Sequence, residues 1–576
     1  MIDGSSDIMQ HPQRNRWILL ALLAAFCVLY LPALSDLAKY HGDEHFYTDA
    51  AARMLETGTY GTPTYADRTP RLNKPLLTYW VVAASFRLLG VNAVASRLPF
   101  LLAACLLVWL TWHTGLRLLA DPAAALLGAV ILLTNQQIAT LACRATPDML
   151  LCLFMAVSLH GFARLILLGQ RTAAAYACAW AGAGLAVAAK GAPGLVAVVF
   201  STLFLILWRA TPLRLRDLFH PPSVLLGIAL AAFGFATPYL QHGTRAVAVL
   251  YEDQIGVRPL AASLGEIIAN LASYLRGTVI FLLPWVALLA LVALRDRAAL
   301  REAVARRPAL YAFGLGWWVL LLSIFALHDF VRLRYLAPAY PLLSILAGSA
   351  LTEALRDSRS ASLIDGCVRA AFALLAVCGS VLLLAGGRID VRLAIAGALC
   401  MGAAAAVLRA RRWAGVAPMV ALGGSVMLCI AAADTFVRPV FDVSPAPAIA
   451  QRLLALGAAG ERAATVGLGP NLASKIRLAS GGRLDVDMLP NGSDTTILAE
   501  RPVLVVPAAL ADRWSARGYR LEACGYEYGT WTAADIWALV TARDRDRIFE
   551  HRKRYTFLAF PNRRYGLTRH SRTKRI

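Results

Sequence analysis

The ten cysteines of this chain include no CxxC pair, and most of them lie inside apolar runs. Their spacing therefore indicates neither a structural zinc site nor a disulfide framework. Charged residues are also scarce, at 16% of the 576 residues, whereas 58% are hydrophobic and the mean hydropathy is +0.58. This composition is typical of an integral membrane protein with room for a large helical domain and one small soluble domain.

Three further absences narrow the range of possible functions. No GxGxxG or P-loop pattern occurs after Asp434, so we predict no nucleotide site there. The chain shows no convincing internal repeat, which a transporter or flippase would be expected to have. No small-residue cleavage signal follows the first apolar run, so the polar and basic segment Met1–Trp17 indicates a retained anchor.

The formal net charge of +22 would suggest a nucleic-acid partner if the protein were soluble. Here most Arg and Lys residues lie in short loops between apolar runs, where they orient helices in the membrane. We therefore expect no nucleic acid among the partners, and membrane lipids instead.

Thirteen apolar stretches fill the first three-quarters of the chain, and each is close to the length of about twenty residues that a spanning helix needs. They predict an all-α polytopic membrane domain over residues 1–434, because helices satisfy their own backbone polar groups inside a bilayer. The predicted spans lie near residues 17–37, 98–117, 122–141, 148–166, 173–189, 191–208, 222–238, 275–294, 309–327, 335–353, 367–385, 391–408 and 413–433.

The basic residues of the loops predict the orientation of these spans. Arg14 and Arg16 precede the first span and place the N-terminus in the cytoplasm, so Asp43 emerges at the outer face. Thirteen crossings then deliver the C-terminal domain to the periplasmic side of a bacterial inner membrane. Two larger loops, 38–97 and 239–271, are periplasmic on the same prediction.

The apolar stretch Pro75–Gly90 inside the first loop is an exception. If it crossed the membrane, Asp148 would fall in the cytoplasm and later basic loops would fall outside. The stretch is short, carries Arg87, and has Tyr79 and Trp80 suited to the headgroup region. We predict a juxtamembrane helix that lies along the outer interface.

After Asp434 the pattern changes to short alternating elements, which predict a small periplasmic α/β domain over residues 435–546. The expected strands are 463–466, 483–486, 502–506, 519–523 and 536–540, and the expected helices are 445–455, 471–478 and 507–513. The basic segment 547–576 favours a disordered, solvated tail or, alternatively, a contact with anionic lipid headgroups or lipopolysaccharide phosphates.

Carboxylates and cations gather at the predicted outer face. A reaction on a phosphorylated lipid needs both, because Arg or Lys holds the phosphate while a carboxylate activates a hydroxyl by accepting its proton. Each residue alone has an ordinary explanation, such as a helix cap or a loop turn, but together they favour a reaction site. The candidate residues are Asp43, Glu44, Tyr47, Lys74, Tyr79, Arg144, Asp148, Lys190, Arg258, His328, Arg334 and Tyr335, and Asp329 and Arg332 lie at the same predicted face.

Six motifs, in this order, resemble the GT-C superfamily of polyprenyl-phosphate-dependent glycosyltransferases, which includes the lipid A aminoarabinose transferases and the protein O-mannosyltransferases. Asp43–Tyr47 is similar to that group's D-E-x-x-Y motif, Arg71–Trp80 to its E-K-P-P-L-x-Y-W stretch, and Ala95–Pro99 to its A-x-R-L-P step. Arg144–Asp148 is similar to its second acidic loop, Ala189–Gly191 to its T-K-G-P turn, and Arg334–Pro341 to its R-Y-x-x-P-x-x-P segment. The motifs cover about residues 15–350, and the span count and external domain extend the resemblance to the whole chain.

The resemblance implies a role for each matching residue. Asp43 would be the catalytic carboxylate and Asp148 its second acidic partner. The donor phosphate would be held by a basic and aromatic set, namely Lys74, Lys190, Arg334 and Tyr335, with Arg258 of the 239–271 loop as a further basic candidate. Two positions depart from the aminoarabinose transferases, since Asn73 stands where they commonly have Glu and Phe46 where they have Arg. The identity of the sugar therefore stays open.

The function expected from the resemblance is that of an inverting glycosyltransferase with a polyprenyl (undecaprenyl) phosphate-linked sugar as donor and lipid A or another glycolipid as acceptor. The sugar would be 4-amino-4-deoxy-L-arabinose or a related pentose or hexose. No cofactor is implied with certainty, and a divalent metal remains an open alternative that would need Asp43 and Asp148 to meet.

A protein O-mannosyltransferase-like enzyme is the alternative function of the same class. A polytopic lipid transporter or flippase is an alternative function of another class. A structural assembly factor whose α/β domain is the active part is a third alternative, but the sequence of that domain shows no candidate site.

Overall fold

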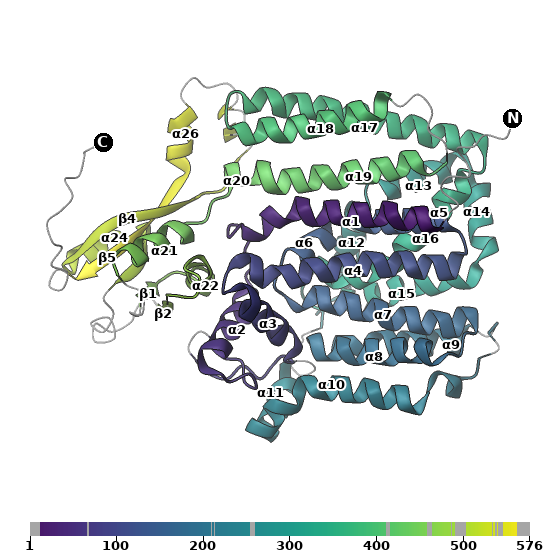
Figure 1. Ribbon diagram of the computed structural model, residues 1–576, viewed down its shortest axis with the longest axis horizontal. Coiled ribbons are helices and arrows are strands. Elements are labelled where there is room, and N and C mark those ends of the chain that lie inside the picture. The colour runs from purple at the N-terminus through teal and green to yellow at the C-terminus, as the bar shows by residue number, and fades with distance from the viewer. Residues whose placement is uncertain are drawn as a thin grey trace.

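A bundle of long helices lying side by side carries a small sheet domain at one end (Figure 1). The computed structural model describes residues 12–65, 68–208, 210–211, 213–253, 260–409, 415–457, 463–484, 486–489, 503–532, 534–535, 538–539 and 545–561.

Ten helical segments of the described residues are long and apolar enough to cross a membrane, judged by length and composition. They are α1 (Pro12–Ser35), α4 (Ala93–Leu119), α7 (Pro147–Leu168), α8 (Ala173–Lys190), α10 (Pro221–His242), α15 (Pro308–Ala326), η4 with α16 (Leu333–Ala339 and Tyr340–Ala354), α17 (Ser358–Gly386), α18 (Val391–Arg409), and α19 with η5 and α20 (Ala417–Ala432, Ala433–Val437 and Arg438–Phe441).

Three of the thirteen predicted spans differ from a single long helix. The first is α5 (Pro122–Leu133) with α6 (Gln136–Ala142), bent by 63°, and the second is α12 (Leu264–Phe281) with α13 (Trp285–Arg295), bent by 95°. The third is the shorter apolar helix formed by η1 (Ala192–Leu195) and α9 (Val196–Leu207). If each bent pair is one span, the described residues hold up to twelve spans rather than thirteen.

The two bends have local causes. The side chain of Asn135 accepts a hydrogen bond from the backbone N–H of Ile138, so a new helix begins there instead of continuing α5. Pro284 separates α12 from α13, and proline has no backbone N–H with which to continue a helix. Hydropathy averaged over the length of a span does not register either break.

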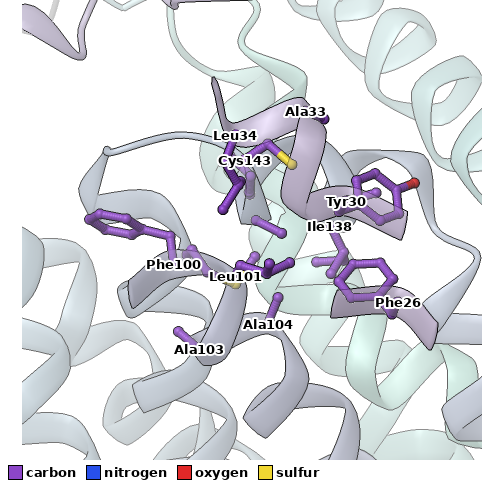
Figure 2. Close-up of a cluster of buried hydrophobic side chains, with 14 of the residues drawn as sticks. Phe26, Tyr30, Ala33, Leu34, Phe100, Leu101, Ala103, Ala104, Ile138 and Cys143 are labelled. Atoms are coloured by element: carbon purple, nitrogen blue, oxygen red, sulfur yellow. The ribbon is translucent and has the colours of Figure 1, made fainter. Parts of the chain in front are cut away.

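One part of the bundle core is formed by α1, α4 and the segment that follows α5. Figure 2 shows Phe26, Tyr30 and Leu34 of α1 meeting Phe100 and Leu101 of α4 beside Ile138 and Cys143, all of them buried. Dispersion contacts among such closely packed side chains hold helices together where lipid removes the ordinary hydrophobic driving force.

The hairpin of α7 and α8 is packed more closely than large side chains would allow. A Cβ atom added to Gly182 would lie 2.5 Å from the backbone nitrogen of Ser158, and one added to Gly161 would lie 2.2 Å from that of Ala179. Small residues let helix backbones approach in this way. The antiparallel pair brings Asp148, at the start of α7, to the level of Lys190, at the end of α8.

The stretch predicted to be juxtamembrane forms α3 (Leu77–Leu89), a helix of 13 residues. Together with α2 (His45–Thr57), it lies at the end of the bundle that faces the sheet domain (Figure 1). The remaining short helices are η2 (Leu215–Leu218), α11 (Thr244–Tyr251) and α14 (Arg297–Arg306). Which side of the membrane this end faces stays a prediction.

A cysteine placed at Leu89, which is 52% exposed, is expected to react with an impermeant thiol reagent from the periplasmic side. A cysteine at Arg216, in η2, is the matched control and should react only from the cytoplasmic side. The measurement is labelling of intact and permeabilised cells, with the parent protein as background. Labelling of position 89 from the cytoplasm alone would reverse the orientation.

The small domain contains a five-stranded sheet with strand order β2-β1-β3-β5-β4. β1 (Ala463–Val466) pairs in parallel with β2 (Val486–Leu489) and β3 (Leu504–Pro507), whereas β5 (Lys553–Pro561) pairs antiparallel with β3 and β4 (Tyr519–Tyr528). Its helices are α21 (Ala446–Ala455), α22 (Pro470–Ala479), η6 (Ala508–Leu510), α24 (Ala511–Ala516) and α26 (Arg545–Arg552).

Three predictions for this domain need correction. The second strand begins at Val486, where the predicted strand 483–486 ends, and within the predicted strand 536–540 the described residues 538–539 are helical. The basic segment 547–576 is not a tail throughout, because residues 553–561 form β5, between β3 and β4. Buried Leu558 and Phe560 provide apolar contacts that the many Arg and Lys residues concealed. Residues 562–576 lie outside the described part of the chain, so lipid contact there stays a prediction.

Candidate active site

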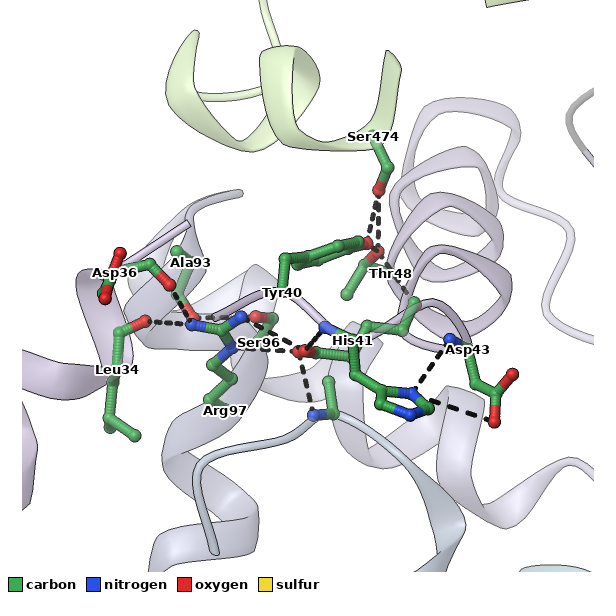
Figure 3. Close-up of polar contacts among 12 residues, drawn as sticks. Leu34, Asp36, Tyr40, His41, Asp43, Thr48, Ala93, Ser96, Arg97 and Ser474 are labelled. Atoms are coloured by element: carbon green, nitrogen blue, oxygen red, sulfur yellow. Dashed lines mark hydrogen bonds and ion pairs between the residues drawn. The ribbon is translucent and has the colours of Figure 1, made fainter. Parts of the chain in front are cut away.

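A turn-rich loop between α1 and α2, residues 36–44, carries the first acidic motif. Its anchor is Glu44, whose carboxylate accepts hydrogen bonds from Arg97 at 2.9 and 3.1 Å and from the backbone N–H of Ala145 at 3.1 Å. Arg97 also donates to the backbone oxygens of Leu34 and Asp36, at 3.0 and 2.8 Å (Figure 3). Both charged side chains are fully buried, so Glu44 is a structural residue and the prediction that it lines a pocket is wrong.

Asp43 emerges next to this anchor and faces the cations of the η4 segment. Its Oδ2 accepts a hydrogen bond from Nη2 of Arg334 at 2.6 Å and lies 3.8 Å from Nη1 of Arg332. Burial opposes ionisation of Asp43, but Arg334 outweighs it, and the pKa of Asp43 is lowered below 3.8. The side chain is 36% exposed, so an ionised carboxylate remains accessible.

Asp148 lies on the other side of Arg334. Its Oδ1 is 2.5 Å from Nζ of Lys190 and 3.8 Å from Nε of Arg334. The ammonium group of Lys190 lies 4.6 Å from the ring centroid of Tyr335, a cation–π contact. Arg334 therefore bridges the two carboxylates that the sequence predicted to act together.

One cavity of about 340 Å³ contains both carboxylates. Five cations and three carboxylates line it, together with aromatic side chains. The lining residues are Asp43, Phe46, Tyr47, Tyr65, Arg71, Asn73, Lys74, Pro147, Asp148, Lys190, Asp253, Phe330, Arg332, Arg334 and Tyr335. The excess of positive charge suits an anionic ligand.

Lys74 reaches this cavity in an ion pair with Asp253, which also accepts a hydrogen bond from Nδ2 of Asn73 at 3.1 Å. Arg71 forms the adjacent wall, where its guanidinium lies 4.1 Å from the ring centroid of Phe46 and donates to the hydroxyl of Tyr79 at 2.8 Å. The two positions that depart from the family motifs, Asn73 and Phe46, thus contact a carboxylate and a cation from elsewhere in the chain.

A second cavity of about 450 Å³ adjoins the first and shares Arg332 and Arg334 with it. Its other lining residues are His41, Gln136, Gln137, Thr140, Arg144, Phe281 and Leu333. Burial, followed by the charges of Arg144 and Arg334, lowers the pKa of His41 below 6.5, so its ring is neutral at pH 7. The two cavities meet at the cations that hold Asp43.

The structure brings together most of the predicted residues. Seven of them line the first cavity: Asp43, Tyr47, Lys74, Asp148, Lys190, Arg334 and Tyr335. Arg144 lines the second cavity, and Tyr79 is fully buried behind the first, against Arg71. His328 lines neither cavity, because its ring contacts the backbone oxygen of Ile324 and its own backbone oxygen accepts from Asn270. Arg258 lies outside the described residues.

The sequence prediction did not single out five of the lining residues, namely Tyr65, Arg71, Pro147, Asp253 and Phe330, and it placed Arg332 at the outer face without choosing it as a site residue. Arg71 and Pro147 lie inside motif segments, so those motifs could have indicated both. Asp253 gives no such signal, because the acidic pair Glu252–Asp253 lies outside the motif segments and far from Lys74 in the sequence. No group of three or more His, Cys, Asp or Glu among the described residues is placed to hold a metal ion.

Comparison with known proteins identifies similar chains. Residues 15–240 match the family described as dolichyl-phosphate-mannose-protein mannosyltransferase. An uncharacterized protein of Aquifex aeolicus is 26% identical over 346 residues, 60% of this chain and 66% of that protein. An undecaprenyl phosphate-alpha-4-amino-4-deoxy-L-arabinose arabinosyl transferase of Pseudomonas fluorescens is 27% identical over 353 residues, 60% of this chain and 62% of that enzyme. The matches thus span less than two thirds of the length of these relatives.

The structural similarity extends over nearly the whole chain. The crystal structure of ArnT from Cupriavidus metallidurans bound to undecaprenyl phosphate matches with a TM-score of 0.66 at 19% identity, covering 94% of this chain and 98% of that one. The chain therefore has the GT-C fold of a multi-pass membrane protein with a small C-terminal domain. The predicted resemblance to polyprenyl-phosphate-dependent glycosyltransferases is confirmed.

Proposed function

We propose that this protein is an inverting glycosyltransferase that moves a sugar from a polyprenyl phosphate to lipid A or another glycolipid at the periplasmic face of the bacterial inner membrane. The observation that carries the proposal is the cavity in which Arg334 joins Asp43 to Asp148 beside Lys74 and Lys190. The similarity of the chain to transferases that use undecaprenyl phosphate supports the same class of donor.

The cations of the cavity suit a phosphate that gains charge during the reaction. The phosphate that links sugar to lipid carries one negative charge, and it acquires a second when the bond to the sugar breaks. Lys74, Lys190 and Arg334 can stabilise that charge more strongly in the transition state than in the ground state, which is what lowers a barrier. Each is held in place by a carboxylate before the donor binds.

Asp43 is the carboxylate placed to act as the base. Its side chain is 36% exposed, whereas that of Asp148 is 6% exposed and pairs with Lys190. In the proposed step the acceptor hydroxyl oxygen forms a bond to the anomeric carbon, the bond from that carbon to the phosphate oxygen breaks, and the hydroxyl proton passes to Asp43. Attack opposite the leaving phosphate inverts the anomeric centre. A weak base suffices when the reacting groups are held in line.

We place the acceptor in the second cavity, from which a hydroxyl could reach Asp43 past Arg332 and Arg334. Arg144 and Arg332 there offer positive charge to an acceptor that carries phosphate, as lipid A does. The sugar we propose is 4-amino-4-deoxy-L-arabinose or a related pentose or hexose, because named relatives transfer that sugar. The match of residues 15–240 to the mannosyltransferase family favours a second candidate, a transferase of sugar to protein hydroxyls.

Purified protein in detergent, supplied with polyprenyl phosphates that carry different sugars, tests the proposal. We expect consumption of one lipid-linked sugar and, by mass spectrometry, its appearance on lipid A or a related glycolipid. Transfer to periplasmic peptides with glycolipids unmodified would favour the second candidate. Consumption of no lipid-linked sugar at all would refute the transferase assignment.

Lys74→Ala is expected to weaken the binding of undecaprenyl phosphate by about 1.5–3 kcal/mol, the contribution of one charge-assisted hydrogen bond. The measurement is equilibrium binding in detergent, compared with the thermal stability of the same variant. Lys553→Ala is the matched control, because Lys553 also pairs with a carboxylate but lies in the sheet domain. Unchanged affinity in Lys74→Ala would place the phosphate elsewhere, with Arg258 the next candidate.

A further inference from the structure

Helix α22 of the small domain contacts the loop that carries Asp43, although more than 400 residues separate them. The hydroxyl of Tyr40 is 2.5 Å from Oγ of Ser474 and 2.6 Å from Oγ1 of Thr48, which is itself 3.1 Å from Ser474 (Figure 3). All three side chains are buried. The triangle of hydroxyls therefore joins the loop, the first turn of α2 and α22.

Further contacts of α22 with the Asp43 loop and α2 come from the same face of the helix. Asn471, Ser474 and Arg477 follow one another at intervals of three residues, which places them on one side. Arg477 is 2% exposed, and its Nη1 lies 3.1 Å from Oε1 of Glu56 near the end of α2. The side chain of Asn471 lies beside Gly42, where an added Cβ would be at an ordinary contact distance of 3.7 Å from Nδ2.

Asp43 lies within the stretch that these contacts hold. Tyr40 and Gly42 precede it, and Thr48 follows it and donates from Oγ1 to the backbone oxygen of Glu44 at 3.1 Å. The loop has no regular hydrogen-bond ladder of its own, so tertiary contacts determine where its backbone lies. Glu44 anchors one side of the loop to the bundle through Arg97, and α22 covers the other side.

We propose that α22 is a positioning element for catalysis, and that Ser474 and Arg477 are positioning residues that keep Asp43 at its place beside Arg334. The inference rests on the proposed function, and it assigns the small domain a part in the chemical step. A displacement of about 1 Å at a reacting group can cost about a hundredfold in rate. The domain would thus act on turnover and not on the capture of the donor phosphate, since the described residues lining the phosphate cavity belong to the bundle and its loops.

The test compares four variants of the full-length protein. Ser474→Leu breaks the hydroxyl triangle by bulk, Ser474→Ala removes only the hydroxyl, and Ser474→Thr restores a hydroxyl. Ala479→Leu adds the same bulk to an exposed position of α22 and is the matched control. We expect kcat to fall about tenfold to a hundredfold in Ser474→Leu, less in Ser474→Ala, and to recover in Ser474→Thr, with binding of undecaprenyl phosphate unchanged throughout. Wild-type kcat in folded Ser474→Leu and Ser474→Ala would overturn the inference, as would a loss of phosphate binding in step with the loss of rate.

A second measurement does not depend on activity. In an Asp43→Cys background, the rate at which an aqueous thiol reagent modifies the new cysteine reports the position of the loop. We expect Ser474→Leu or Ser474→Ala to change that rate and Ala479→Leu to leave it unchanged. Equal rates in all variants would refute the positioning role. If the wild-type protein transferred no sugar from a polyprenyl phosphate, the proposed function would fail, while the labelling rates would still decide whether α22 positions the loop.

Discussion

Replacement of Asp43 by asparagine is expected to lower kcat by about 10²–10⁴-fold, the usual contribution of a positioned general base. Asparagine preserves the size of the side chain but cannot accept the proton of the acceptor hydroxyl. Arg334 would keep a carboxylate neighbour in Asp148, so the cavity should still bind undecaprenyl phosphate. The measurement is a single-turnover rate alongside equilibrium binding of the lipid phosphate.

The control for this prediction is Asp365→Asn, which removes a carboxylate of α17 that pairs with Arg369 one turn along the same helix. It should transfer sugar at the wild-type rate. Because Arg334 holds the pKa of Asp43 below its usual value, Asp43 stays ionised at neutral and mildly acidic pH, and a loss of rate there must come from another group. Turnover close to wild type in Asp43→Asn would remove Asp43 from the mechanism.

Replacement of Arg97 by methionine is expected to reduce the free energy of unfolding by about 3–5 kcal/mol, since removal of one partner of a buried ion pair leaves an uncompensated charge. The uncompensated group is Glu44, which is fully buried. Glu44→Met should cost a similar amount, because it leaves the guanidinium of Arg97 without its carboxylate. Equilibrium unfolding in mixed detergent is the measurement.

The double variant Glu44→Met/Arg97→Met separates the charge effect from the loss of packing. With neither charge present, part of the stability should return, because an apolar pair has no desolvation cost. Recovery will be incomplete, since the backbone oxygens of Leu34 and Asp36 and the N–H of Ala145 lose their partners. A single variant as stable as the wild type would contradict the structural role assigned to Glu44.

The neighbours Asp43 and Glu44 illustrate what local sequence leaves undecided. Both are acidic residues of one motif at the end of the first span, and the sequence predicted both for the site. Glu44 faces Arg97 of α4 and is inaccessible, whereas Asp43 faces Arg334 of η4 and lines the cavity. Which carboxylate lines the cavity therefore depends on contacts with residues more than fifty positions away.

Hydropathy, loop charge and the motifs are local properties of the sequence, so they were sufficient to predict the membrane fold and the position of most site residues along it. The pairing of Asp253 with Lys74, the contact of α22 with the loop of Asp43, and the addition of β5 to the sheet from within a basic segment appear only in the folded structure. Each of these depends on residues brought together from distant parts of the chain. Packing geometry selects such pairs among many residues of the same type, and no local pattern records that choice.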